Sequence, residues 1–169
     1  MPIIVSKIFY LCSKIILFII YGGAMNVKIN YVAVGVAAIA MWLLGAIWYN
    51  VFSAQWMMYA GVTEELGKSM SGMDVAIMYG GSIIAFFVTF YVQSHIHHAF
   101  TVQDIKGALQ AAVWSWLGFA VTVMYVNNSY QGKSVLLTLI DSGYWLIGMA
   151  VGGMILVKMQ KRNANVTER

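Results

Sequence analysis

The amino-acid sequence predicts an all-α integral membrane protein, a four-helix bundle with short loops. Apolar residues make up 61% of the 169 residues and charged residues only 9%, whereas about 25% of the residues in a typical soluble domain are charged. Such a chain has too little polar surface to cover a water-soluble globule. Four apolar segments are also long enough to cross a hydrocarbon core, so we expect the lipid bilayer to be the solvent of this chain.

Each predicted span has roughly 19–23 residues, which at about 1.5 Å per residue crosses a core about 30 Å thick. The first three spans carry no charge, and the fourth carries only Asp141. Pro2 is the only proline, so no span should contain a proline kink. The spans are Tyr31–Phe52, Val75–Gln93, Ala108–Val126 and Val135–Val157.

Polar segments separate the spans and are predicted to be loops. In the first of them, Thr63 followed by Glu64 and Glu65 is typical of a helix start, with Thr63 as the N-cap. This short helix could cover the polar cluster described below. The loops are Ser53–Asp74, Ser94–Gly107 and Asn127–Ser134, and a basic, fraying cytoplasmic tail follows from residue 158 to residue 169.

Lysines and arginines predict the orientation of the bundle, because cytoplasmic loops are enriched in them. Lys68 and Lys133 would lie on one side of the membrane. The other side would hold both ends of the bundle and six basic residues, which are Lys28, Lys106, Lys158, Lys161, Arg162 and Arg169. We therefore expect a multi-pass protein of a bacterial inner (plasma) membrane with both ends of the bundle in the cytoplasm.

Residues 1–24 precede the four-span membrane domain, residues 25–157, and are too short and too charged to form another span. Three interpretations remain open. The segment could be an interfacial amphipathic helix, or an upstream extension of a chain that starts at Met25. It could also be a signal peptide, although cleavage would then leave the basic tail outside, against the charge bias.

Composition and motifs exclude several functions. The formal charge of +4 is not arranged as a basic stripe with aromatic residues, so we expect no nucleic-acid partner. Cys12 is the only cysteine, so no intrachain disulfide can form. The sequence has no phosphate-binding loop, dinucleotide motif, nucleophile elbow or zinc-protease motif. We therefore expect neither enzymatic activity nor a cofactor.

Asp141 is the first candidate site residue, because it lies about 10 Å inside the fourth span at about 1.5 Å per residue. A carboxylate there costs about 2.5–3.5 kcal/mol unless it faces the bundle interior or a wet cavity. It could serve a proton or substrate site, or a structural hydrogen-bond cluster that fixes helix packing. The predicted topology places its candidate partners at the same depth, namely Trp48, Tyr49, Asn50, Tyr79, Tyr125, Asn127, Asn128 and Tyr144.

Histidines form the second candidate site, since His95, His97 and His98 follow the second span. His95 and His98 would share one helical face and could bind a metal together with Asp104 or with a partner chain. The set of ligands is incomplete for a closed zinc site. The alternative is an interfacial cluster that titrates near neutral pH.

Glycine and tryptophan residues indicate packing rather than chemistry. Gly148 and Gly152 form a G-x-x-x-G pattern that allows close helix approach, either within the chain or in a homo-oligomer, and Gly81 with Ala85 is a weaker pair. The six tryptophans are predicted to lie mostly in interfacial girdles and packing positions.

Short motifs give the chain a resemblance to a known family. They are Gly45-Ala46-Ile47-Trp48-Tyr49, Trp56, Ala60-Gly61-Val62-Thr63-Glu64-Glu65 and Ile140-Asp141-Ser142-Gly143-Tyr144. In order and spacing these motifs resemble the family called domain of unknown function 1761, small membrane proteins mostly from bacteria. The resemblance covers about residues 25–157 and departs from the family at Asn50-Val51. It implies a four-helix membrane fold and no particular activity.

The sequence thus predicts a non-enzymatic structural or accessory membrane protein. The alternative is a small proton- or solute-transport protein that acts as a homo-oligomer through a polar pocket around Asp141.

Overall fold

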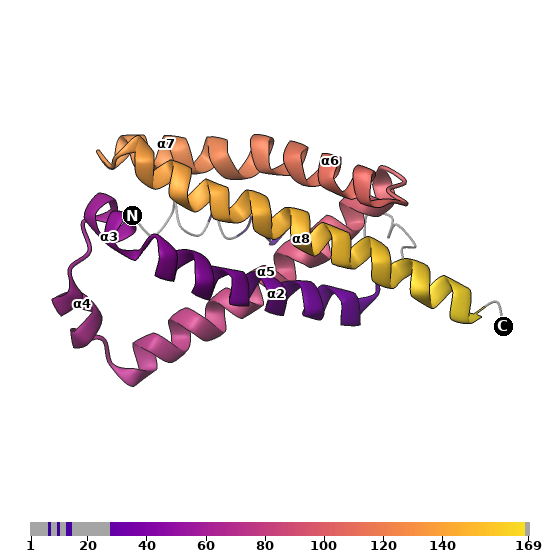
Figure 1. The fold of residues 1–169 in the computed structure, drawn as a ribbon, viewed down its shortest axis with the longest axis horizontal. Coiled ribbons are helices and arrows are strands. Elements are labelled where there is room, and N and C mark those ends of the chain that lie inside the picture. The colour runs from indigo at the N-terminus through magenta and orange to yellow at the C-terminus, as the bar shows by residue number, and fades with distance from the viewer. Residues whose placement is uncertain (1–6, 8–9, 11–12, 15–27, 168–169) are drawn as a thin grey trace.

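Four helices in the computed structural model are long and apolar enough to cross a membrane, as predicted (Figure 1). The structure describes residues 7, 10, 13, 14 and 28–167, and shows only helices and their connections there. The helices are α2 (Tyr31–Val51), α5 (Gly72–Ala99), a continuous third helix made of α6 (Ile105–Ser115), η1 (Trp116–Val121) and α7 (Thr122–Tyr130), and α8 (Val135–Thr167).

Two helix ends differ from the prediction. The fourth helix continues beyond the predicted end of the span at Val157 to Thr167, so most of the predicted tail is helical. No glycine or proline interrupts the sequence after Gly153, and a basic composition alone does not end a helix. The second helix continues into the predicted loop as far as Ala99 and therefore contains all three histidines.

The first connection contains two short helices, α3 (Ser53–Ala60) and α4 (Glu64–Ser69). Gly61 ends α3 with a φ of 71°, a left-handed conformation that glycine adopts without strain. The Thr63 hydroxyl accepts a hydrogen bond from the Leu66 amide at 3.4 Å, which confirms Thr63 as the N-cap of α4. Ser71 and Asp74 then form a capping box at the start of α5.

The third helix is irregular at its centre, where η1 is a π-helix. A π-helical turn is rare and is found often at functional sites. The sequence has no proline in this segment, so a proline ring does not cause the wide turn. Its first residue, Trp116, donates its indole N–H to the Ser142 carbonyl of α8 at 2.7 Å, which fixes the turn against the fourth helix.

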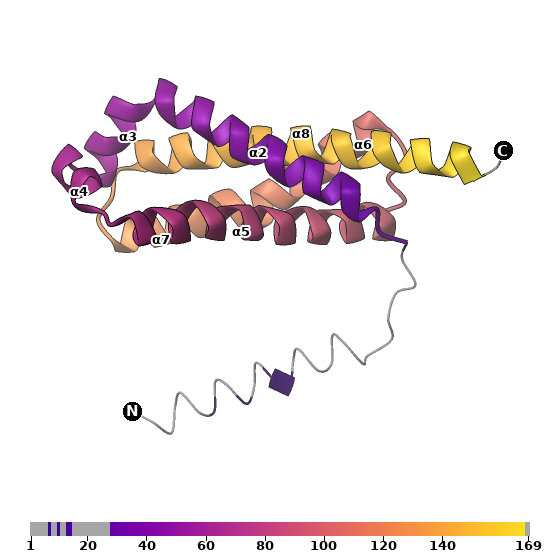
Figure 2. The same ribbon diagram turned by 90° about the horizontal axis from the view of Figure 1, so that it is seen from below.

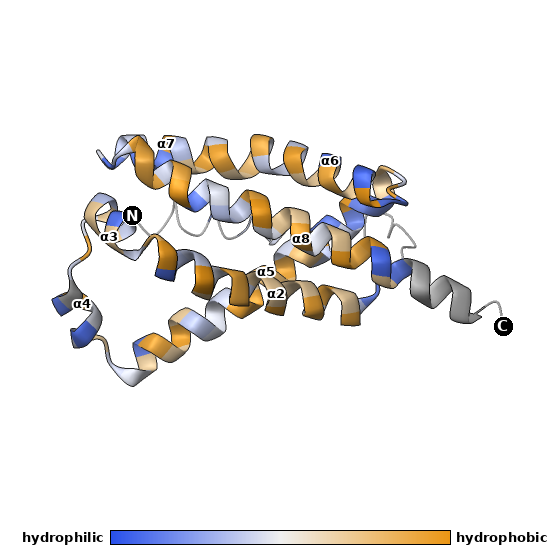
Figure 3. Cartoon of the chain, viewed as in Figure 1, coloured by the Kyte–Doolittle hydropathy of each residue, from blue (hydrophilic) through white to orange (hydrophobic). Residues whose placement is uncertain are grey.

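Helix α8 is the centre of the bundle and contacts α2, α3, α5 and the whole third helix. Figures 1 and 2 show it running along the full length of the molecule. Helix α5 crosses α2, and its first half diverges from the bundle next to α4, leaving apolar side chains such as Ile77 and Ile84 exposed. Hydrophilic residues gather at the two ends of the bundle (Figure 3).

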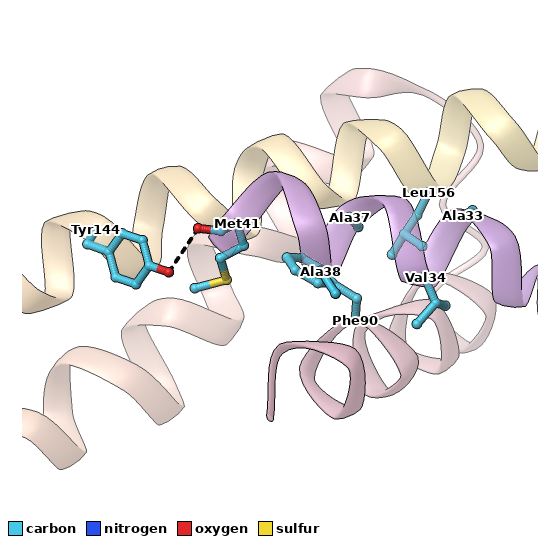
Figure 4. Packing of buried hydrophobic residues seen from close by; sticks show 8 residues of the cluster. All are labelled: Ala33, Val34, Ala37, Ala38, Met41, Phe90, Tyr144 and Leu156. Atoms are coloured by element: carbon cyan, nitrogen blue, oxygen red, sulfur yellow. Dashed lines mark hydrogen bonds between the residues drawn. The ribbon is translucent and has the colours of Figure 1, made fainter. Parts of the chain in front are cut away.

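Small residues bring α2 and α8 together. Ala33, Ala37 and Ala38 of α2 are buried at helical spacing and pack in one cluster with Phe90 of α5 and Tyr144 of α8 (Figure 4). Side chains from the other helices also lie against the glycines of α8. A Cβ atom at Gly148 would lie 3.0 Å from the Met41 Cε, and one at Gly152 would lie 1.9 Å from the Phe90 Cε1.

The G-x-x-x-G pattern of α8 is therefore occupied within the chain, by Met41 of α2 and Phe90 of α5. The weaker pair at Gly81 and Ala85 differs, since nothing lies within 4 Å of a Cβ built at Gly81. The three interpretations of residues 1–24 concern a segment that, apart from residues 7, 10, 13 and 14, is outside the described residues.

Gly152→Ala is expected to destabilise the protein by about 1–3 kcal/mol, the usual cost of overpacking a close-packed core. The buried Phe90 ring would have to move to admit the methyl group. Thermal unfolding in detergent measures the effect. Gly81→Ala is the matched control in an open position, and equal melting temperatures for the two variants would contradict the packing argument.

A candidate functional site around Asp141

Asp141 lies half-buried on α8, two turns from the start of that helix. Its Oδ1 accepts two hydrogen bonds, from the Tyr49 hydroxyl of α2 at 2.9 Å and from the Trp56 indole N–H of α3 at 3.1 Å. Both donors reach the same oxygen, so Oδ2 accepts neither bond. We call Tyr49, Trp56 and Asp141 the Asp141 network.

The first and last family-like motifs pack directly on one another around this network. The Trp48 indole donates to the Ile140 carbonyl at 3.1 Å, and a Cβ at Gly143 would lie 3.3 Å from the same indole. The Tyr144 hydroxyl passes over Gly45 and donates to the Met41 carbonyl at 3.0 Å (Figure 4). Tyr144 therefore supports the helix contact without bonding to Asp141.

The middle motif and the last turn meet at the same end of the bundle. The Lys133 Nζ donates to the Ala60 carbonyl at the end of α3. Asn128 of α7 donates to the Thr138 hydroxyl of α8 at 2.9 Å. These contacts hold α3 and α7 close to the first turns of α8, and the arrangement at Asp141 depends on them.

A cavity of about 400 Å³ opens beside Asp141, and we call it the Asp141 cavity. The Asp141 network forms part of its wall. The side chains of α7 and of the following turn contribute three amides, which are Asn127, Asn128 and Gln131. Amide groups can donate and accept hydrogen bonds, so the cavity suits water or a small polar solute.

The structure separates the predicted partners of Asp141 into two groups. Tyr49 bonds to the carboxylate, and Asn127 and Asn128 line the cavity. Trp48 donates to the Ile140 carbonyl next to Asp141, and Tyr144 donates to the Met41 carbonyl of α2. Three others lie elsewhere. Asn50 and Tyr125 are exposed and do not line the Asp141 cavity, and Tyr79 packs edge-on against Trp42 with ring centroids 6.0 Å apart.

Trp56 is the partner that sequence reasoning missed. Composition and position predict an interfacial or packing role for Trp56, but α3 folds back so that the Trp56 indole reaches Asp141. The predicted short helix at Thr63 is present as α4, but α3 rather than α4 contacts α8. In the sequence, only the place of Trp56 among the family-like motifs singles it out, and this place does not show which residue its side chain contacts.

The histidines lie inside α5 rather than after it. His95 is half-buried with its ring edge-on to Tyr91 at 4.7 Å, and His98 is exposed. His97 is buried, and both its ring nitrogens lack a partner. Asp104 caps α6 by accepting a bond from the Gly107 amide at 2.8 Å. Among the described residues, no three histidine, cysteine, aspartate or glutamate side chains are grouped to hold a metal ion.

Together the helices and the Asp141 network define an α-helical membrane protein with one carboxylate held inside its apolar region. The chain belongs to the family described as protein of unknown function (DUF1761), whose model matches residues 32–157 and so covers the four apolar helices. This match confirms the family resemblance. No curated protein and no solved structure matches the chain.

Removing either donor from the Asp141 network should lower stability. Tyr49→Phe and Trp56→Phe are each expected to lower the free energy of unfolding by about 1–3 kcal/mol. This is the range for losing a hydrogen bond to a charged group or for leaving a buried polar group without a partner. Because both donors bond to Oδ1, the double variant should be non-additive. Thermal unfolding of the single and double variants measures this. Tyr125→Phe, on an exposed ring of α7, is the control and should be neutral.

Proposed function

We propose that the protein is a non-enzymatic, multi-pass membrane protein with a structural or accessory role, in which the Asp141 network holds the first membrane helix, α2, and the short helix α3 against the fourth membrane helix, α8. The supporting observation is that one carboxylate oxygen joins three elements, α2, α3 and α8. A carboxyl group inside an apolar region persists only where other groups compensate it. Here the compensation comes from two side chains that also determine where α2 and α3 lie.

We further propose that both ends of the bundle lie in the cytoplasm of a bacterium. The start of α2 and the end of α8 are neighbours, since the Asn30 amide donates to the Met159 carbonyl at 3.4 Å. The predicted charge bias of six basic residues against two favours this end as the cytoplasmic one. The Asp141 cavity would then open toward the outer side. Neither a nucleic-acid partner nor a cofactor is part of the proposal.

A second candidate function is transport of protons or small solutes. The observation that favours it is the Asp141 cavity itself, where a carboxyl group and three amides face a common space. A purely structural carboxylate would need no such space. Four helices rarely enclose a path alone, so this candidate includes a homo-oligomer, for which the exposed apolar half of α5 offers a surface.

Two substitutions at Asp141 separate the candidates. Asp141→Asn keeps an oxygen that can accept both bonds, whereas Asp141→Ala leaves the Tyr49 hydroxyl and the Trp56 indole without their acceptor. For a structural role, we expect Asp141→Asn to accumulate and to melt like the wild type. Asp141→Ala should lose about 1–3 kcal/mol for each donor left unpaired in a buried position.

Transport predicts a different pattern. Asp141→Asn would leave the protein level and oligomeric state unchanged but abolish a flux in liposomes. A structural role is contradicted if the alanine variant folds and melts like the wild type.

The orientation is tested by single cysteines in a Cys12→Ser background, placed at Ser134 and at Gln160. We expect a membrane-impermeant maleimide to label the Ser134 position in intact cells and the Gln160 position only after the membrane is opened. Labelling of both positions in intact cells would contradict the arrangement.

A further inference from the structure

The Asp141 carboxylate keeps one oxygen open to the Asp141 cavity. Oδ1 accepts the bonds from Tyr49 and Trp56. Oδ2 accepts no hydrogen bond from the described residues, and it is not one of their buried unpaired polar atoms. Since Asp141 lines the Asp141 cavity, its Oδ2 is accessible to a molecule in that cavity.

No basic side chain pairs with this carboxylate in the part of the chain that the structure describes. Both donors of the Asp141 network are neutral. Lys133, the basic residue of the last turn, donates to the Ala60 carbonyl and is not part of the cavity wall. A carboxylate in an apolar region is costly unless other groups compensate its charge. A cation in the cavity would supply the positive charge that these neighbours do not provide.

Three aromatic rings line the same cavity, namely Tyr49 of α2, Trp56 of α3 and Trp145 of α8. Tyr49 and Trp56 meet edge to face with ring centroids 5.7 Å apart, and both bond to Asp141, so the two rings and the carboxylate form one corner of the cavity. Aromatic rings attract cations that lie within about 6 Å of the ring centroid, and tryptophan does so most strongly. Rings beside a carboxylate are therefore well suited to an organic ammonium ion.

The part of the wall formed by α7 and the following turn offers hydrogen-bond acceptors. The Asn128 amide nitrogen donates to the Thr138 hydroxyl at 2.9 Å, which leaves its carbonyl oxygen as an acceptor. Asn127 and Gln131 are exposed, and each carries a further amide oxygen. A ligand with an N–H or hydroxyl group can therefore be bonded in addition to its charge.

The composition of the wall favours an organic cation over a metal ion. A calcium ion takes about six to eight oxygen ligands, whereas much of this wall consists of aromatic rings, and the Tyr49 hydroxyl is already bonded to Asp141. The described residues contain no group of three metal-ligating side chains of histidine, cysteine, aspartate or glutamate. The volume of about 400 Å³ lies within the range of about 300–1,000 Å³ for pockets that hold small molecules.

The end of the bundle that holds the Asp141 cavity is also the acidic end. It contains α3, α4, the start of α5, the end of α7 and the start of α8 (Figure 1). In sequence, the acidic residues of these segments outnumber the basic ones, with Glu64, Glu65, Asp74 and Asp141 against Lys68 and Lys133. An excess of negative charge raises the local concentration of cations.

We propose that the Asp141 cavity binds a small organic ammonium ion, with its charge beside the Asp141 Oδ2, its alkyl groups against the Trp56 and Trp145 rings, and a polar group on the Asn128 oxygen. This inference rests on the second candidate function, transport of small solutes, and names the class of solute. Binding requires no path through the bundle, because a pocket that is open at one end is sufficient.

Choline and its uncharged isostere dimethylbutanol, in which a carbon atom replaces the nitrogen, test the role of the charge. Purified protein in a maltoside detergent is titrated with each compound at constant ionic strength, and the melting temperature and tryptophan fluorescence are recorded. A ligand that binds only the folded state raises the melting temperature. We expect saturable stabilisation by choline chloride and none by dimethylbutanol. Equal effects of the two compounds would overturn the proposal.

A matched pair of variants locates the site. Asp141→Asn is expected to weaken choline binding about tenfold or more, because one partner of the charge pair is lost. Asp104→Asn makes the same change on the carboxylate that caps α6 at the other end of the bundle, and it keeps an oxygen for the Gly107 amide. It should bind choline like the wild type. Equal affinities of the two variants would contradict the site, and the isostere comparison on the wild type does not depend on either variant folding.

The ammonium group of a phospholipid head group has the same chemistry as the free ion. Dioleoylphosphatidylcholine and dioleoylphosphatidylglycerol are therefore added to the micelles in separate samples. Stabilisation by phosphatidylcholine alone, with no effect of free choline, would support an ammonium site but assign it to a lipid. Stabilisation by free choline supports a soluble ligand.

Uptake of labelled choline into liposomes separates this inference from the transport candidate. If choline binds but is not taken up, the ammonium site stands and the transport candidate loses its support. If Asp141→Asn abolishes the flux of another solute, and neither choline nor phosphatidylcholine binds the wild type, transport stands and the ammonium site is wrong.

Discussion

The close contact between α2 and α8 is the constraint on which the rest of the structure depends. Alanines on α2 and glycines on α8 let the two helices approach until Met41 lies against Gly148. Only at that separation do the Trp48 indole and the Tyr49 hydroxyl reach α8. In hydrocarbon there is no hydrophobic force between apolar helices, so such packing and hydrogen bonding must supply the association.

The family-like motifs acquire a common physical meaning from this contact. The G-A-x-W-Y segment provides a small residue for Tyr144 and two donors for α8, and the I-D-x-G-Y segment provides the acceptors. The A-G-x-T-E-E segment ends α3 and starts α4, which returns the chain to α5. Residues far apart in sequence therefore form one hydrogen-bonded region. A substitution in this region should therefore disturb the packing of α2, α3 and α8 together.

Polar groups inside the bundle fall into two kinds. The tryptophans around Asp141 are hydrogen-bonded, since the indole N–H groups of Trp48, Trp56 and Trp116 all donate to acceptors of α8. Gln93 and His97 retain buried atoms without hydrogen-bond partners, and Gln93 also lines a cavity. The first kind explains how the helices are held. The second is the physical reason to consider water inside the bundle, because unmet polar atoms are costly in a medium of low dielectric.

The sequence by itself determined the all-helical class and the four helices that are long and apolar enough to cross a membrane, because both follow from composition and from the length of apolar runs. It did not determine that α5 would include the histidines, because that depends on where a helix stops. Only the tertiary structure decided that Trp56 bonds to Asp141 while Asn50 and Tyr125 point elsewhere, and that His97 is buried. Hydropathy records depth in the membrane, whereas the rotation of each helix and the return of α3 depend on packing between distant segments.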